Sequence, residues 1–128
     1  MNTSPQSQFQ RALLAIAGLL GAGGVALAAR AAHGGGNVAV LAIAAQFLLV
    51  HAAGLMAIGA WIRQAGALRA RMLTIAALIM ALAAALFGAD LTVFGMFGHS
   101  LFPFAAPVGG LGMIAAWLLV AATGLLTP

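Results

Sequence analysis

The sequence predicts an all-α integral membrane protein in which four helices form one antiparallel bundle with both termini in the cytoplasm. Of its 128 residues, 65% are apolar and only 5% are charged, with a mean hydropathy of +1.17. A soluble domain carries about a quarter charged residues, so this composition leaves too little polar surface to face water. Turn-forming segments divide the chain into four apolar stretches, each long enough to cross a hydrocarbon core of about 30 Å.

The first predicted helix covers residues 9–32. A polar tail over residues 1–10 precedes it, Arg11 follows the tail, and an uncharged apolar run over residues 12–29 ends at Arg30. The run is similar to a signal peptide, with a small-residue site at Ala26-Leu27-Ala28, but it exceeds the usual h-region of about 7–15 residues. We therefore expect a membrane helix that is not cleaved. The three glycines of residues 34–36 break it, because glycine has high backbone freedom.

The second predicted helix covers residues 38–62, and the third covers residues 70–94. The second contains Gln46 and His51 and ends at Trp61 beside Arg63, a pair that is typical of an interfacial anchor. In the third, 18 residues from 72 to 89 carry no charge and are followed by Asp90, which is the only acidic residue. An ionisable group at such a place needs a partner, water or a proton.

The fourth predicted helix covers residues 107–126 after an irregular segment over residues 95–106. Pro107 suits the first turn of a helix, where its missing N–H group costs nothing. The whole chain, residues 1–128, is then a single transmembrane domain. There is no cysteine, so a disulfide, a thiolate nucleophile and a zinc–thiolate site are all excluded.

The arginines indicate the orientation of the bundle. Four spans place the N-terminus, the connection between the second and third helices and the C-terminus on one side. That side holds Arg11, Arg63, Arg69 and Arg71, whereas the other side holds only Arg30. The positive-inside rule places the side with four arginines in the cytoplasm. The net charge of +4 is therefore explained by membrane topology, and we expect no nucleic-acid partner.

Small residues recur at every fourth position and indicate close helix packing. Such positions are Gly18 and Ala22, then Gly24, Ala28 and Ala32 in the first helix, Ala77, Ala81, Ala85 and Ala89 in the third, and Gly112 and Ala116 in the fourth. In lipid, helices associate through close backbone approach. These faces indicate either packing within the bundle or an interface with a second copy of the chain.

Several stretches, taken together, resemble a known family. They are Ala31-Ala32-His33, Gln46 with His51-Ala52, Phe87-Gly88-Ala89-Asp90-Leu91, Pro107-Val108-Gly109-Gly110 and Ala116-Trp117. Their order and spacing resemble the domain-of-unknown-function 423 family of small four-helix membrane proteins, to which transmembrane protein 256 of animals is related. The chain departs from the family pattern at Arg30, Ala89 and Ala116. The resemblance implies an inner-membrane or mitochondrial-type location and brings neither an activity nor catalytic residues.

Arg30 and Asp90 form the first candidate site. Each lies 18 residues beyond the start of an apolar run, so both are expected about 27 Å from the cytoplasmic side at 1.5 Å per residue. The two helices run in the same direction, and a guanidinium offers a planar fork to a carboxylate. We expect a direct or water-bridged ion pair, which either fixes the two helices together or forms a proton-sensitive site.

His51 and Gln46 form the second candidate site. His51 is expected near the bilayer midplane, either as a neutral imidazole bonded to a carbonyl or hydroxyl group, or as a proton relay or ligand contact. Gln46 precedes it by five residues, which is about 140° around the helix. His33, His99 and Asp90 could in principle hold a metal ion, but their spacing matches no ligand motif, so no metal, cofactor or catalytic residue is expected.

These observations predict a small inner-membrane protein of a bacterium that is not an enzyme. Its expected role is structural or accessory, through binding of lipid or of another membrane subunit. The partners expected are the lipid bilayer and possible protein partners, either another membrane protein or a second copy of the chain. The alternative is a small channel or transporter, as an oligomer, that uses the intramembrane groups Gln46, His51 and Asp90.

Overall fold

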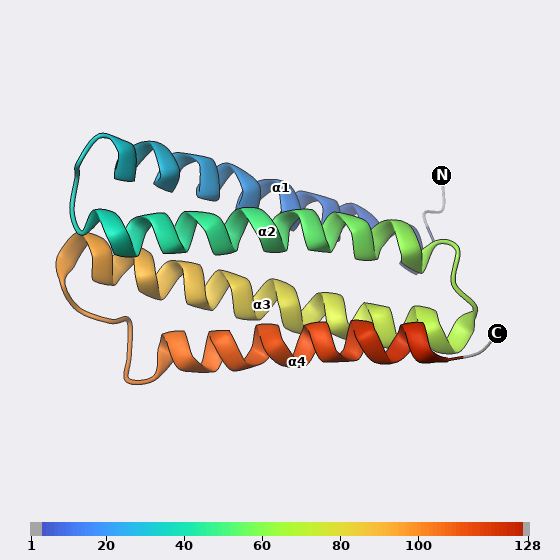
Figure 1. Ribbon diagram of the computed structural model, residues 1–128. Helices are drawn as coiled ribbons and strands as arrows, with labels where there is room; N and C mark the ends of the chain where they lie inside the picture. Colours follow the sequence, from blue (N-terminus) through green and yellow to red (C-terminus); the bar gives the residue numbers. More distant parts are fainter. Residues whose placement is uncertain (1–3, 127–128) are drawn as a thin grey trace.

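Four α-helices make up almost all of the computed structural model, which describes residues 4–126. Their bounds are Pro5–Ala32 for α1, Val38–Ile62 for α2, Ala67–Phe97 for α3 and Ala105–Leu125 for α4. Each connection reverses the chain, so that α1 packs on α2, α2 on α3, and α3 on α4 in antiparallel pairs (Figure 1). No strand occurs within residues 4–126. The predicted all-α antiparallel four-helix bundle is confirmed.

The outer surface of the bundle is apolar along its length. All four helices are long and apolar enough to cross a membrane. Large side chains such as Leu19, Leu82 and Leu118 are each 66% or more exposed on three different helices. A soluble monomer does not present so much contiguous apolar surface to water. The chain is therefore a multi-pass membrane protein.

The two ends of the bundle differ in charge. The start of α1, the connection from α2 to α3 and the end of α4 lie together at one end (Figure 1). We call this the arginine end, after Arg11, Arg63, Arg69 and Arg71. The opposite end carries the turn between α1 and α2 and the longer loop between α3 and α4. The grouping of four arginines at one end agrees with the expectation from the sequence.

α1 begins earlier than the sequence predicted. Its first residue is Pro5, and the Ser4 hydroxyl accepts a hydrogen bond from the N–H group of Ser7 at 3.3 Å. Serine before a proline is a favourable helix start, because the hydroxyl satisfies a free N–H group and proline has none to satisfy. The polar segment expected to be a tail is therefore helical from Pro5 to Gln10. Residues 1–3 of that expected tail lie outside the described residues.

α3 is longer than predicted by three residues at each end, and α4 begins two residues earlier than predicted. α3 ends where Gly98 adopts a left-handed conformation with φ 79°, and its N–H group donates to the Phe94 carbonyl at 2.9 Å. Pro107 is the third residue of α4, still within the first turn, where N–H groups have no partner inside the helix. α2 has the predicted bounds.

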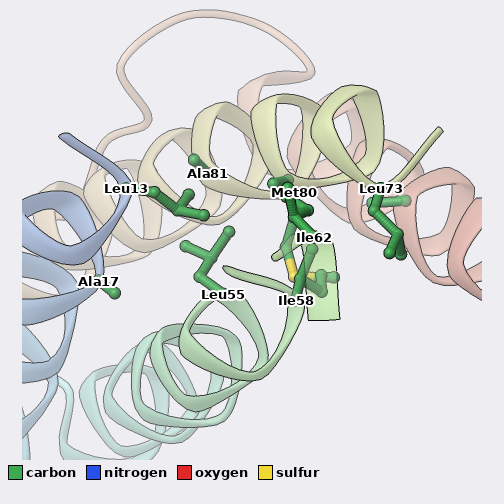
Figure 2. Packing of buried hydrophobic residues seen from close by; sticks show 10 residues of the cluster. Leu13, Ala17, Leu55, Ile58, Ile62, Leu73, Met80 and Ala81 are labelled. Carbon is green, nitrogen blue, oxygen red and sulfur yellow. The ribbon is translucent and has the colours of Figure 1, made fainter. Parts of the chain in front are cut away.

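Apolar side chains from the first three helices form the core near the arginine end of the bundle. Figure 2 shows Leu13 of α1, Leu55 and Ile58 of α2, and Met80 and Ala81 of α3 directed toward one another. Leu55 and Met80 are completely buried. These contacts hold α1, α2 and α3 together. Ala116 brings α4 into the same cluster.

The turn between α1 and α2 is joined to the end of α3 by its backbone. The N–H group of Asn37 donates to the Gly95 carbonyl at 2.7 Å. Gly36 has a φ of 76° and lies so close to Gly95 that a Cβ atom would not fit. Glycine is therefore required at residue 36 both for conformation and for space.

The small-residue positions divide between the interior and the outer surface. Gly24, Ala77, Ala81 and Ala116 are buried in the bundle, and Gly112 packs on Ala83. In contrast, Gly18, Ala22, Ala85 and Ala89 are exposed. Packing within the bundle thus accounts for part of the predicted pattern and leaves some small residues on the surface.

Candidate functional site

His51 lies in the middle of α2 and is 4% exposed. Its Nδ1 atom is 2.7 Å from the carbonyl oxygen of Phe47, one turn earlier in the same helix, and its Nε2 atom is 3.2 Å from the indole Nε1 atom of Trp117 in α4. A carbonyl can only accept and an indole N–H group can only donate. These partners assign a neutral imidazole that carries its proton on Nδ1, with both ring nitrogens occupied.

Two aromatic rings, those of Phe47 and Trp117, lie beside this imidazole. The Phe47 ring stacks on it with centroids 5.8 Å apart, and Phe87 of α3 lies 4.8 Å from Phe47. The backbones of α2 and α4 do not approach one another closely anywhere in residues 4–126. The Trp117 side chain therefore links α2 to α4 across the groove between them. We call His51 and Trp117 the midplane pair.

The sequence predicted one half of the midplane pair. The expected bond from His51 to a backbone carbonyl is confirmed, whereas the role of Trp117 was missed. Position along the helix could have revealed it. His51 lies 13 residues after Val38, the start of α2, and Trp117 lies 12 residues after Ala105, the start of α4. Both helices start at the same end of the bundle, and each of the two residues lies near the middle of its helix.

Asp90 is 3% exposed and binds two backbone N–H groups. Its Oδ1 atom accepts from Leu101 at 2.7 Å, in the loop after α3, and its Oδ2 atom accepts from Ala106 at 3.2 Å, in the first turn of α4. Phe104, the residue that precedes α4, offers no capping side chain of its own. The Asp90 carboxylate thus caps α4 from the neighbouring helix, where the dipole of α4 favours a negative charge.

The bonds of Asp90 hold a strained loop. Phe104 has a φ of 68°, and it is the only residue other than glycine with a positive φ among residues 4–126. A bulky side chain in this conformation is an outlier that the surrounding structure must hold in place. Leu101 and Ala106 lie on either side of Phe104, and both donate to the same carboxylate. Asp90 therefore holds the loop closed at the start of α4.

The expected direct ion pair between Arg30 and Asp90 is wrong. Within residues 4–126 no salt bridge joins the two side chains, and both carboxylate oxygens already accept from backbone donors. The guanidinium of Arg30 lies instead against Gly35 in the following turn, and the side chain is exposed. A long arginine side chain at the end of a membrane helix can reach water, so it does not need a carboxylate.

Gln46 lies away from the midplane pair. Its side chain is exposed and makes no hydrogen bond within residues 4–126. It lines a shallow apolar groove of about 600 Å³ between α1 and α2, next to Ala42 and Ala45. The structure thus distributes the four predicted candidates over separate places and does not bring them into one cavity.

Arg69 is a further residue with a structural role that its sequence pattern did not predict. Its guanidinium donates to the carbonyl oxygen of Leu126, the residue that follows α4. A cation there complements the negative end of the helix dipole. α4 therefore has a carboxylate from α3 at its N-terminal end and a guanidinium from α3 at its C-terminal end.

These arrangements limit what the polar groups can do chemically. No group of three or more His, Cys, Asp or Glu side chains in residues 4–126 is arranged to hold a metal ion. The imidazole of His51 and the carboxylate of Asp90, the two buried groups that could exchange a proton, each have an internal partner on both of their polar atoms. Their evident role in this arrangement is to fix helices and a loop.

Comparison with known proteins gives one match. A family model described as a protein of unknown function, DUF423, matches residues 20–110. That stretch includes Gln46, His51 and Asp90 and ends just after the start of α4. The comparisons with curated proteins and with solved structures gave no match.

Proposed function

Because this chain belongs to the DUF423 family, whose description assigns no activity, we propose that it is a small accessory protein of the bacterial inner membrane. In this proposal it is not an enzyme, and it acts by binding lipid or another membrane subunit. Proteins of the inner membrane usually cross it with apolar helices, and the four helices of this chain are long and apolar enough to do so. The proposal concerns the outward surfaces of the bundle, since these are what a lipid or a subunit would contact.

One observation carries the proposal. Both nitrogens of His51 and both carboxylate oxygens of Asp90 are occupied by partners inside the chain. A catalytic acid, base or nucleophile needs a free atom that can reach a substrate. The polar Gln46 side chain and the exposed small residues, in contrast, face outward and remain available for contact. In lipid, polar and small residues are those through which membrane helices associate.

The same observations give little support to the alternative of a channel or transporter. Such a pathway would need polar groups that share a wet cavity at the centre of the membrane. Gln46 is exposed on the surface between α1 and α2, whereas His51 and Asp90 are buried at different depths. Proteoliposomes that contain the wild-type chain can be tested for a flux of protons or ions. A flux that is lost in both His51→Ala and Asp90→Asn would favour this alternative over the accessory role.

Purification tests the accessory role directly. The full chain, tagged and extracted in a mild maltoside detergent, should retain a membrane subunit or a lipid in a reproducible ratio by native mass spectrometry. An unrelated four-helix membrane protein with the same tag and expression level serves as the control. A chain that is isolated repeatedly as a bare monomer, with neither lipid nor subunit, would contradict the proposal.

A further inference from the structure

A groove between the start of α1 and the end of α2 carries two arginines. Arg11 of α1 and Arg63, which directly follows α2, both line it, and its volume is about 510 Å³. We call it the arginine groove. Its walls are apolar and include Leu14 and Met56, which are 60% and 55% exposed. The groove therefore combines two cations at its rim with an apolar surface that runs toward the membrane interior.

No acidic side chain among the described residues balances the charge of this groove. The one acidic residue, Asp90, lies seven residues before the last residue of α3, and α3 ends at the opposite end of the bundle. Within residues 4–126 neither Arg11 nor Arg63 forms an ion pair or a hydrogen bond through its side chain. Arg69, in contrast, is already bound to the carbonyl of Leu126. Arg11 and Arg63 are thus two free guanidinium groups in one groove.

We propose that the arginine groove binds the headgroup of an anionic phospholipid. The proposal rests on the proposed function, in that it names a lipid for the membrane-facing role. Guanidinium groups bind phosphate oxygens through paired, charge-assisted hydrogen bonds. The amide of Gln10 lines the same groove and adds a neutral donor. Leu14 and Met56 then offer an apolar surface along which the first part of an acyl chain can lie.

The depth of the groove favours a lipid over a free phosphate ion. Arg11 lies six residues into α1, and Arg63 follows the last residue of α2, so both are near the boundary of the apolar spans. Basic grooves between helices at this depth suit anionic lipid headgroups.

The test uses the full chain in a nonionic detergent. Dipalmitoyl phosphatidylglycerol and phosphatidylcholine with the same chains are titrated separately, and bound lipid is counted by native mass spectrometry. Phosphatidylglycerol should bind selectively to the wild-type chain. The double variant Arg11→Gln/Arg63→Gln should bind it at least about tenfold more weakly, because two charge-assisted contacts are lost.

The matched control is Arg30→Gln/Arg71→Gln. It removes the same number of charges, but Arg30 lies at the opposite end and Arg71 lines a different groove between α1 and α3. This variant should bind phosphatidylglycerol as the wild type does. Circular dichroism checks that both variants remain folded.

A photolabelling experiment on the wild-type chain gives a readout that needs no variant. A phosphatidylglycerol with a photoreactive acyl chain should form adducts at Leu14 or Met56.

Four outcomes would overturn the proposal. They are equal loss of binding in both double variants, equal binding of the two lipids, full competition by glycerol 3-phosphate, and photoadducts that avoid the groove. The first indicates bulk charge attraction, and the third indicates a site for free phosphate. A chain that fails these tests but still copurifies with a membrane subunit would leave the accessory role intact.

Discussion

Asp90 illustrates how a single acid is accommodated inside an apolar protein. Burial of a carboxylate is costly unless hydrogen bonds replace the lost water. Here two backbone N–H groups do so, and both belong to the segment that connects α3 to α4. The first turn of α4 is thereby satisfied. The Ala105 N–H group bonds to Phe102, the Ala106 N–H group bonds to Asp90, and Pro107 has none.

Replacement of Asp90 by alanine should therefore destabilise the protein. It leaves the N–H groups of Leu101 and Ala106 without an acceptor, which costs about 1–3 kcal/mol for each group that water cannot reach. Asp90→Asn retains one acceptor oxygen and should have a smaller effect. Thermal unfolding in detergent, followed by circular dichroism, measures both variants.

A double-mutant cycle of Asp90→Ala with Arg30→Ala provides the control. Because the two side chains form no ion pair, their effects should add within about 0.5 kcal/mol. Strong coupling between the two changes would show that the pairing expected from the sequence operates after all.

The midplane pair makes the second prediction at the scale of residues. His51→Leu and Trp117→Phe each leave the other side chain without its hydrogen-bond partner. Hydrogen bonds between membrane helices couple by about 0.6 kcal/mol on average and by at most about 1.7 kcal/mol. We expect a coupling in this range, measured by thermal unfolding of the two single variants and the double variant.

Gln46→Leu is the matched control for this cycle. It removes a polar side chain from the same helix, but Gln46 has no hydrogen bond to lose within residues 4–126. Its effect on stability should stay within about 0.5 kcal/mol. A fully additive His51 and Trp117 cycle, or a cost for Gln46→Leu as large as that for His51→Leu, would contradict this account.

At the scale of elements, α3 organises the bundle through two of its three charged side chains. Asp90 caps the start of α4, and Arg69 binds the carbonyl after its end. The two residues are 21 positions apart in α3, and α4 has 21 residues. Because the two antiparallel helices have the same rise per residue, the carboxylate lies at the positive N-terminal end of the α4 dipole and the guanidinium lies at its negative C-terminal end. α3 thus sets both the position and the direction of α4.

Close approach of α3 and α4 gives the third prediction. A Cβ atom on Gly109 would lie 2.9 Å from the carbonyl oxygen of Ala83 and from the backbone nitrogen of Phe87. Backbone cannot move aside as a side chain can, so Gly109→Ala should force the helices apart at a cost of about 1–3 kcal/mol. The midpoint of thermal unfolding in detergent should fall.

The next residue supplies the comparison. A Cβ atom on Gly110 would meet nothing within 4 Å. Gly110→Ala should be neutral or stabilising by up to about 1 kcal/mol, because alanine favours helix more than glycine does. Equal effects at the two positions would mean that helix propensity, and not packing, decides the outcome.

At the scale of the whole molecule, the sequence was sufficient for the architecture and insufficient for the side-chain partners. Hydropathy and turn signals located four helices because a bilayer demands long apolar spans. The expectation of a direct Arg30–Asp90 pair failed because it left out backbone N–H groups as partners for the carboxylate. The N–H groups before α4 were an equally good partner, and the absence of a capping residue at Phe104 was the available signal.

Orientation in the membrane is the fourth prediction, and it follows from the whole distribution of charge. Four of the five arginines lie at one end of the bundle, and the sequence contains no cysteine, so single-cysteine variants can be labelled without background. The positive-inside rule predicts that Gln64→Cys, between α2 and α3, faces the cytoplasm and that Ser100→Cys, between α3 and α4, faces outward.

A maleimide that cannot cross membranes should therefore label Ser100→Cys in intact bacterial cells and label Gln64→Cys only after the cells are opened. Both residues are exposed, so a lack of labelling in intact cells reflects the membrane barrier, and labelling of both variants after lysis checks this. The reverse pattern would place the arginine groove in the outer leaflet and would contradict the topology predicted from the arginines.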